Sequence, residues 1–272
     1  MYSYQDLIAA YREVGVEQNK VIYWTGDLTP LMKFDRPGKK AVLGAHCDAL
    51  RELIGSGGTL VVPTGSSLRN TDIPFDTNET GSEMGVFTEY VRQSQGAYRS
   101  CHPFVSYAAI GKHAKTVTEN VARHAYGPET PEDRMISLDT TSVSVGLHPR
   151  LTCSVIHHVE MLMGVPYRYT KGCLHPVVRG GEIMNEPFYE YLWHKETLLG
   201  ELEASVRLLN KNRNIWSYFT ANHELKMVRV GRGRIYAYSM AEFYRCAIEL
   251  FRDDIYIWLR ELPDVRLYYQ RN

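Results

Sequence analysis

Two adjacent histidines and an acid stand in an otherwise apolar run, LTCSVIHHVE at residues 151–160. On a helix, residues three apart share one face, so His157 and Glu160 can meet while His158 points about 100° away. An imidazole that is oriented by a carboxylate can act as a general base. A histidine on an apolar helix is also often a packed core residue. The residue types leave both interpretations open for His157, and they indicate a packing or surface position for His158.

Two other kinds of chemistry compete for the same segment. Cys153 lies four residues before His157 and could be a thiol nucleophile, although an ordinary buried thiol would show the same pattern. A metal site would need ligands at regular spacing. The HHxE segment, even with His148 nearby, lacks the i, i+4 histidine pair of a helical zinc site, so we expect no metal.

The elements that must position these residues alternate between helix and strand. Hydrophobic periodicity predicts helices at 4–15, 41–55, 84–92, 113–125, 154–164 and from 241 onward. Short β-branched runs predict strands at 21–25, 59–64, 104–111 and 140–146, and a hairpin across the GRG of residues 231–233. The pattern predicts an α/β fold, with a single mixed α/β domain over residues 1–272 and a site in the loops that follow strands.

Composition limits the classes of partner. The 272 residues carry 31 basic and 31 acidic side chains, so no net field favours nucleic acid. No apolar run reaches the length of a membrane span, and the acidic N-terminus is unlike a signal peptide, so we expect no membrane partner and a cytoplasmic location. The five cysteines are scattered and odd in number, which indicates reduced thiols.

One long segment carries a specific family pattern: PFDTNETGSEMGVFTEYVRQSQGAYRSCHPFVSYAAIG, residues 74–111. Together with GGTLVVPT (57–64), CSVIHHVE (153–160) and VPYRY (165–169), it resembles the aminoglycoside 3-N-acetyltransferase family, also called the antibiotic N-acetyltransferase family. The resemblance implies that family's α/β fold, a central sheet flanked by helices. It also implies transfer of acetyl from acetyl-CoA directly to a sugar amine, without an acyl-enzyme.

The resemblance assigns roles by position. It implies that His157 is the general base, that Glu160 orients it, and that Ser154 lies near the oxyanion. The family's Asn-Thr pair is Cys153-Ser154 here, so the amide of the Asn is missing. Asp76, in an FDT loop where the family has FDP, is a candidate for the histidine's relay or for the acceptor pocket, and equally for a turn aspartate.

Further candidates concern the two substrates. For the amine, the candidates are Asp76, Glu83 and Glu89. For the CoA arm, by resemblance, the candidates are Thr25, Gly26, Arg99, Ser100, His102 and Ser106. In the WTGDL loop, Asp27 would repel a phosphate, which makes CoA contacts there less favourable.

The leading hypothesis is an acetyl-CoA-dependent N-acetyltransferase that acts on an amino sugar, as a monomer or homodimer. The neutral charge balance, with a pI near 7.1, favours a nucleotide-linked amino sugar over a polycationic aminoglycoside. Three alternatives remain open: a true aminoglycoside 3-N-acetyltransferase that gives antibiotic resistance, a cysteine-dependent acyltransferase or thioesterase, and an inactive homologue that binds acyl-CoA.

Overall fold

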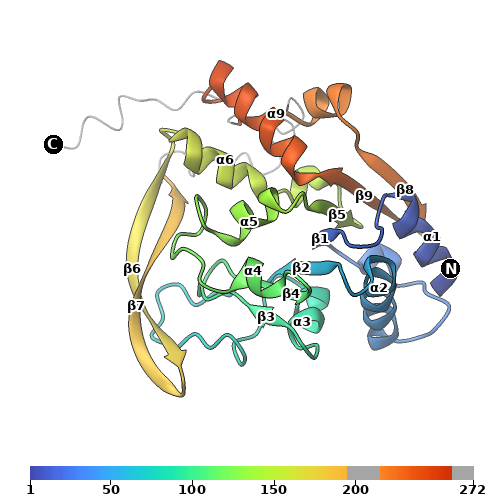
Figure 1. Cartoon of the computed structure of the whole chain (residues 1–272), viewed down its shortest axis with the longest axis horizontal. Coiled ribbons are helices and arrows are strands. Elements are labelled where there is room, and N and C mark those ends of the chain that lie inside the picture. The colour runs from blue at the N-terminus through green and yellow to red at the C-terminus, as the bar shows by residue number, and fades with distance from the viewer. Residues whose placement is uncertain (195–214, 259–272) are drawn as a thin grey trace.

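The computed structural model describes residues 1–194 and 215–258. Within these residues the chain forms a seven-stranded mixed sheet with helices on both faces, and a separate two-stranded ribbon (Figure 1). The strands of the large sheet are β1 (Val21–Gly26), β2 (Thr59–Pro63), β3 (Tyr98–Arg99), β4 (Tyr107–Gly111), β5 (Thr141–Val145), β8 (Lys226–Val230) and β9 (Gly233–Ser239). This arrangement confirms the predicted α/β class.

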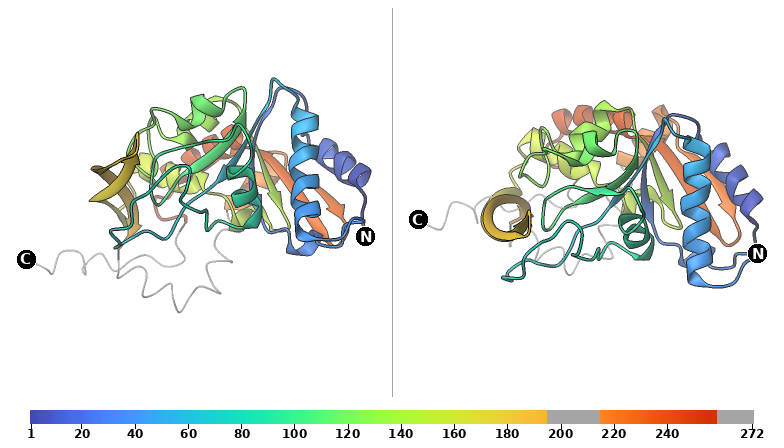
Figure 2. Two further views of the ribbon diagram at one scale, coloured as in Figure 1. Left: turned by 90° about the horizontal axis from the view of Figure 1, so that it is seen from below. Right: turned by 60° about the horizontal axis from the view of Figure 1, so that its bottom comes forward.

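Helices cover both faces of the sheet. The described helices are α1 (Tyr4–Glu13), α2 (Lys39–Ile54), α3 (Val86–Arg92), α4 (Ala114–Thr118), α5 (Pro131–Ser137), α6 (Val155–Met163) and α9 (Met240–Asp253), with 3-10 turns at η1 (Thr29–Leu31) and η2 (Pro149–Leu151). Residues 215–222 are also helical. Helices α1, α2 and α3 pack on one face, and α4, α5, α6 and α9 on the other (Figure 2).

Strand β1 shows how the two cores form from one sequence. Its side chains alternate, so Ile22 and Trp24 enter the core beneath α1 to α3, whereas Val21 and Tyr23 enter the core beneath α5, α6 and α9. All four are almost wholly buried, which is why this strand reads as a continuous apolar run.

The order of strands decides where a site can form. The sheet runs β3-β4-β2-β1-β5-β9-β8, and β1 pairs in parallel with both β2 and β5, whereas the other pairs are antiparallel. The carboxyl ends of β1, β2 and β5 therefore meet at one edge. In α/β sheets such an edge is the usual place for a ligand.

Most predicted elements are confirmed, but one predicted helix is too long. The predicted helix at 113–125 ends at Thr118, as α4. The Arg134 guanidinium donates to the carbonyl oxygens of Thr116, Glu119 and Asn120 at 2.6 to 2.8 Å, and Asn120 has a positive φ of 50°. These contacts satisfy the end of the helix and turn the chain away from it.

A long ribbon, absent from the sequence-based prediction, extends from the end of the molecule opposite α1 and α2 (Figures 1 and 2). It consists of β6 (Arg168–Arg179) and β7 (Glu182–Trp193), joined by Gly180 and Gly181, which both have positive φ. Backbone bridges from Phe75 to Val177 and from His124 to Tyr189 connect the ribbon to the body.

The hairpin at GRG is confirmed as β8 and β9. A single domain over 1–272 stays a prediction, because residues 195–214 and 259–272 lie outside the described part. None of the helices in the described part is both long and apolar enough to span a bilayer.

Candidate active site

A cavity of about 410 Å³ opens at the edge where β1, β2 and β5 end. This volume is within the range of small-molecule sites. Its lining comes from the ends of these strands, from α3 and the segment before it, from the start of β4 and the segment before it, from Tyr126, and from α6 with the segment before it. The lining residues are Tyr23, Thr25, Gly26, Pro63, Gly65, Met84, Thr88, Phe104, Val105, Ser106, Tyr107, Tyr126, Leu147, Leu151, Thr152, Cys153, Ser154 and His157.

His157 and Glu160 meet on one face of α6, as their spacing predicts. His157 Nδ1 lies 2.9 Å from Glu160 Oε2. The Glu160 side chain is wholly buried, whereas the His157 side chain is 31% exposed and lines the cavity. Because Nδ1 is engaged inside the protein, Nε2 is the ring nitrogen left for a substrate.

Arg168, the first residue of β6, completes this group. Its Nε lies 2.8 Å from Glu160 Oε2, and its Nη2 lies 3.0 Å from His157 Nδ1. When Nδ1 carries the hydrogen that it donates to Glu160, the contact with Nη2 joins two donors and is not a hydrogen bond. The guanidinium stacks on Trp193, with 4.0 Å from Cζ to the ring centroid. The buried carboxylate therefore has a cation as well as the imidazole. Arg168 is not among the site residues that the sequence predicts, although it lies in the VPYRY segment that carries the resemblance.

His158 faces a different environment. It is almost wholly buried, its Nδ1 accepts a 3.3 Å hydrogen bond from the Gly127 amide, and its ring lies against Tyr244. Burial lowers its pKa, so the ring is neutral. His158 is a packing residue.

Ser154 lies on the floor of the cavity. It occupies the N-cap position of α6, but its hydroxyl makes no capping hydrogen bond and instead lies 3.1 Å from the Tyr23 hydroxyl. Behind it, Tyr107 donates a 2.8 Å hydrogen bond to Glu132, whose side chain is wholly buried. Burial raises the pKa of Glu132 to about 7. No pattern in the sequence singles out Glu132, because an acid in the first turn of a helix is ordinary.

Three of the six residues predicted to contact CoA line the cavity: Thr25, Gly26 and Ser106. Thr25 Oγ1 is buried and has no hydrogen-bond partner in the described residues, so it is free to bond a ligand amide. Gly26 has a φ of 139°, and a Cβ there would lie 2.0 Å from the Val145 carbonyl oxygen. Packing between β1 and β5 therefore requires this glycine.

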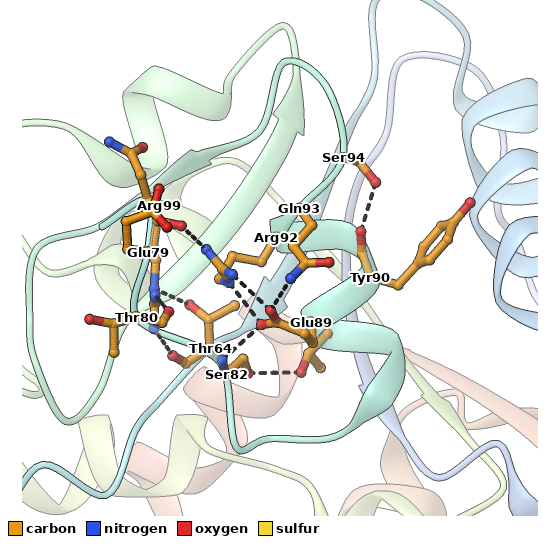
Figure 3. Close-up of polar contacts among 12 residues, drawn as sticks. Thr64, Glu79, Thr80, Ser82, Glu89, Tyr90, Arg92, Gln93, Ser94 and Arg99 are labelled. Atoms are coloured by element: carbon orange, nitrogen blue, oxygen red, sulfur yellow. Dashed lines mark hydrogen bonds and ion pairs between the residues drawn. The ribbon is translucent and has the colours of Figure 1, made fainter. Parts of the chain in front are cut away.

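The other three, Arg99, Ser100 and His102, are used inside the protein. The half-buried Arg99 guanidinium donates to Ser106 Oγ at 3.0 Å and to the carbonyl oxygens of Thr64 and Thr80 (Figure 3). Ser100 Oγ accepts from the Tyr107 amide, and His102 Nδ1 accepts from two amides of its own turn. None of the three lines the cavity, and their contact with CoA stays a prediction.

The predicted amine-binding acids also lie outside the cavity lining. Asp76 Oδ1 accepts from the amides of its own turn, which is the alternative that its FDT loop allowed. Glu89 binds Arg92 and the Ser82 amide (Figure 3). Glu83 binds the amide and hydroxyl of Ser67. Glu83 and Glu89 line a second hollow beside α2 and α3, together with Lys39 and Lys40.

Two departures from the family pattern have local explanations. Cys153 is buried, and burial raises its pKa to about 12, so the thiol is protonated at neutral pH. A protonated thiol is a poor nucleophile, which weighs against the cysteine-dependent hypothesis. Asp27 Oδ1 accepts from the amide and hydroxyl of Thr29, so its carboxylate caps the η1 turn.

Nothing in the described part of the chain forms a group of three or more histidine, cysteine or carboxylate side chains suited to a metal. All five cysteines are free thiols.

Comparison with known proteins finds relatives both by sequence and by structure. Residues 38–252 match the family model described as aminoglycoside 3-N-acetyltransferase. Among curated proteins, aminoglycoside N(3)-acetyltransferase IV of Salmonella sp is 30% identical over 159 residues, which cover 57% of this chain and 58% of that relative. The match thus spans little more than half the length of this relative.

Solved structures share the fold. The structure named AAC-VIa bound to sisomicin has a TM-score of 0.77 at 19% identity, covering 93% of this chain and 98% of that one. The AAC-IIIb binary complex with CoASH has a TM-score of 0.75 at 16% identity, covering 92% and 96%. Since the family model spans most of the sequence, including β1's partner strands and α6, the chain belongs to the aminoglycoside 3-N-acetyltransferase family.

Proposed function

We propose that this chain transfers the acetyl group of acetyl-CoA directly to an amine of an aminoglycoside. The observation that carries the proposal is the 2.9 Å contact between His157 Nδ1 and Oε2 of the buried Glu160. The imidazole of His157 also lines the cavity. Membership of the family and the name of the Salmonella relative support the reaction. The CoASH complex of AAC-IIIb supports acetyl-CoA as co-substrate.

His157 is the general base in this proposal. With Nδ1 protonated and donating to Glu160, Nε2 accepts the proton of the amine as the amine nitrogen attacks the acetyl carbon. The C–N bond forms, the C–S bond breaks, and the proton passes from His157 to the departing sulfur. Glu160 holds the ring in this tautomer and stabilises the imidazolium, while Arg168 fixes the carboxylate.

Two hydroxyls that line the cavity bind acetyl-CoA in this proposal. Ser154 donates a hydrogen bond to the acetyl oxygen as negative charge develops on it. Thr25, whose hydroxyl is free, bonds an amide of the pantetheine arm. Cys153 takes no chemical part, because its thiol stays protonated.

The family indicates the acceptor amine more directly than the net charge of the chain does. Neutral charge balance favoured a nucleotide-linked amino sugar, but total charge does not locate charges. The comparisons support the aminoglycoside alternative instead. In the second hollow, the Glu83 carboxylate accepts from Ser67 and pairs with no cation in the described residues, so it is available to an acceptor ammonium group.

The proposal also implies the cytoplasm, where acetyl-CoA is available and thiols stay reduced. Whether the chain acts as a monomer or homodimer stays a prediction, which sedimentation would decide.

The deciding experiment measures CoA release from acetyl-CoA with a panel of acceptors, for wild type, His157→Ala and Cys153→Ala. The panel contains aminoglycosides and nucleotide-linked amino sugars. We expect turnover on aminoglycosides, a loss of about 10²- to 10⁴-fold in His157→Ala, and a rate near that of wild type in Cys153→Ala.

Each contrary result favours one of the alternative hypotheses. Turnover on nucleotide-linked sugars alone would reject the aminoglycoside acceptor. Loss of activity in Cys153→Ala, with His157→Ala unaffected, would reinstate the thiol mechanism. Binding of acetyl-CoA by calorimetry without any acetylated product would point to an inactive homologue.

A further inference from the structure

The Ser154 hydroxyl lies against a tyrosine that has no part in the proposed proton transfer. Tyr23 of β1 is almost wholly buried, but it reaches the cavity lining, and its hydroxyl lies 3.1 Å from Ser154 Oγ. The two residues are 131 positions apart in the sequence, so the docking of α6 on the sheet brings them together. Two hydroxyls at this distance form a hydrogen bond, in which either oxygen can be the donor.

Tyr23 is held firmly at the centre of the sheet. In the parallel ladders on either side of β1, it is paired with Val61 of β2 and with Ser142 of β5. Its ring packs against that of Tyr107, with 6.0 Å between the centroids. Because the ring is buried and the backbone is paired on both sides, the Tyr23 hydroxyl is fixed relative to the cavity.

The Ser154 hydroxyl lacks such support from its own helix. An N-cap serine usually has an extended backbone and accepts from an amide of the first turn, but Ser154 has φ and ψ of −80° and −21° and makes no such bond. Its carbonyl oxygen accepts from the His157 amide at 2.9 Å, so its backbone is connected to that of the proposed base. Its hydroxyl hydrogen can still rotate. The contact with Tyr23 therefore restricts a group that α6 leaves free.

The available hydrogen-bond partners favour Tyr23 as the donor. Tyr23 has no other hydrogen-bond partner in the described residues. If Ser154 donated, the buried phenol hydrogen would be left without an acceptor, which is costly. If Tyr23 donates, that hydrogen is satisfied, and the Ser154 hydrogen is left for an oxygen in the cavity. Burial also raises the pKa of Tyr23 well above its usual value, so the phenol keeps its hydrogen.

Resting on the proposed acetyl transfer, we propose that Tyr23 is a positioning residue, whose hydroxyl donates to Ser154 Oγ and directs the Ser154 hydrogen toward the acetyl oxygen. Tyr23 itself touches no reacting atom. Its donation polarises the serine hydroxyl, which strengthens the hydrogen bond from Ser154 as negative charge develops on the acetyl oxygen. Because that charge is largest in the transition state, the effect is expected in kcat more than in the affinity for acetyl-CoA.

The test measures kcat and the KM for acetyl-CoA, at a saturating aminoglycoside, in wild type, Tyr23→Phe, Ser154→Ala and the double variant. Tyr23→Phe keeps the ring and removes the hydroxyl. We expect its kcat to fall about five- to tenfold, with little change in the KM for acetyl-CoA. We expect Ser154→Ala to lose about 10²-fold. The double variant should be no slower than Ser154→Ala, because Tyr23 acts through the serine hydroxyl.

A matched control separates this role from support of the fold. Tyr11 is also wholly buried, and its hydroxyl lies 2.7 Å from His46 Nδ1 in the core on the opposite face of the sheet. Tyr11→Phe therefore loses a comparable hydrogen bond outside the cavity lining. We expect it to keep the wild-type kcat, and thermal melting compares its stability with that of Tyr23→Phe.

A spectroscopic measurement gives a result that does not depend on turnover. The infrared band of the thioester carbonyl, isolated with acetyl-CoA that is isotopically labelled at that carbon, moves to lower frequency as the hydrogen bond to its oxygen strengthens. We expect the band of bound acetyl-CoA to lie at higher frequency in Tyr23→Phe than in wild type, and higher still in Ser154→Ala. The band in Tyr11→Phe should match that of wild type.

The possible results separate the role of Tyr23 from the reaction itself. An unchanged kcat and carbonyl band in Tyr23→Phe would reject the role while acetyl transfer stands. So would a further loss of rate when Tyr23→Phe is added to Ser154→Ala. If wild type acetylates no amine but the carbonyl band still responds to Tyr23→Phe, the proposed function fails and the positioning of Ser154 by Tyr23 is retained. If the band does not respond either, both proposals fail.

Discussion

At the scale of single residues, surroundings decide what a side chain can do more than its type does. His157 and His158 are neighbours in the chain, yet one contacts a carboxylate beside the cavity and the other accepts from a buried amide. Thr25 and Ser100 differ in the same way. The Thr25 hydroxyl has no partner in the described residues, whereas Ser100 Oγ accepts from the Tyr107 amide.

This difference predicts that one hydroxyl deletion changes the KM for acetyl-CoA, whereas another changes the free energy of unfolding. Thr25→Val keeps the side-chain shape, so the free energy of unfolding changes little, while KM for acetyl-CoA rises about two- to tenfold through loss of one hydrogen bond. Ser100→Ala leaves KM unchanged but lowers the free energy of unfolding by about 1–3 kcal/mol, because a buried amide loses its acceptor. Steady-state kinetics and urea unfolding separate the two. A raised KM in Ser100→Ala alone would return Ser100 to the CoA site.

At the scale of elements, the site depends on contact between α6 and the ribbon. Arg168 at the start of β6 binds Glu160 of α6 and stacks on Trp193 at the end of β7. Both strand ends nearest the body therefore support the same carboxylate. His157 and Glu160 both lie in helix α6, but the cation that neutralises Glu160 comes from the ribbon.

This contact predicts how two charge deletions combine. Arg168→Met leaves the buried Glu160 charge without its cation, so the free energy of unfolding decreases by about 3–5 kcal/mol. Adding Glu160→Gln removes the unpaired charge and restores most of that stability. The double variant stays slow in acetyl transfer, because His157 lacks its carboxylate. Urea unfolding of the single and double variants checks this, and equal instability of the two would contradict it.

Local patterns predicted the elements better than the contacts between them. The β-branched strands at 21–25 and 59–64 and the apolar face of α6 follow from periodicity. The end of α4 depends on Arg134, a residue distant in the chain, and no local pattern reveals it. The Gly180-Gly181 turn was a readable hairpin signal, but the pairing of Arg168 with Glu160 depends on how the ribbon docks. The burial of Glu132 likewise arises from tertiary packing.

At the scale of the whole molecule, two buried histidines far from each other in sequence connect stability to pH. His46 lies in α2 between the hydroxyls of Tyr11 and Tyr2, at 2.7 and 3.1 Å. His102 accepts from backbone amides. Burial lowers the pKa of each to about 3 from an ordinary 6.5. Between pH 3 and 6.5, these two histidines are protonated in the unfolded chain but neutral in the folded protein.

Stability therefore decreases as pH falls from 6.5 toward 3, by about 1.4 kcal/mol per pH unit for each histidine. His46→Gln keeps a hydrogen-bonding side chain that does not titrate, so we expect its slope to be shallower than that of wild type by this amount. Urea unfolding at several pH values in the window measures both slopes, and the difference cancels contributions from carboxyl groups. Parallel slopes would mean that His46 is protonated in the folded state.

The stacking of Arg168 on Trp193 has a practical consequence. The Trp193 indole ring lies 4.0 Å from a guanidinium that also contacts Glu160 and His157, so we expect its fluorescence to respond to the charges of these side chains. Trp193 would thus serve as an optical reporter beside His157 and Glu160. Replacing Trp24, Trp216 and Trp258 by phenylalanine would isolate that signal and allow acetyl-CoA binding to be followed in real time without any attached dye.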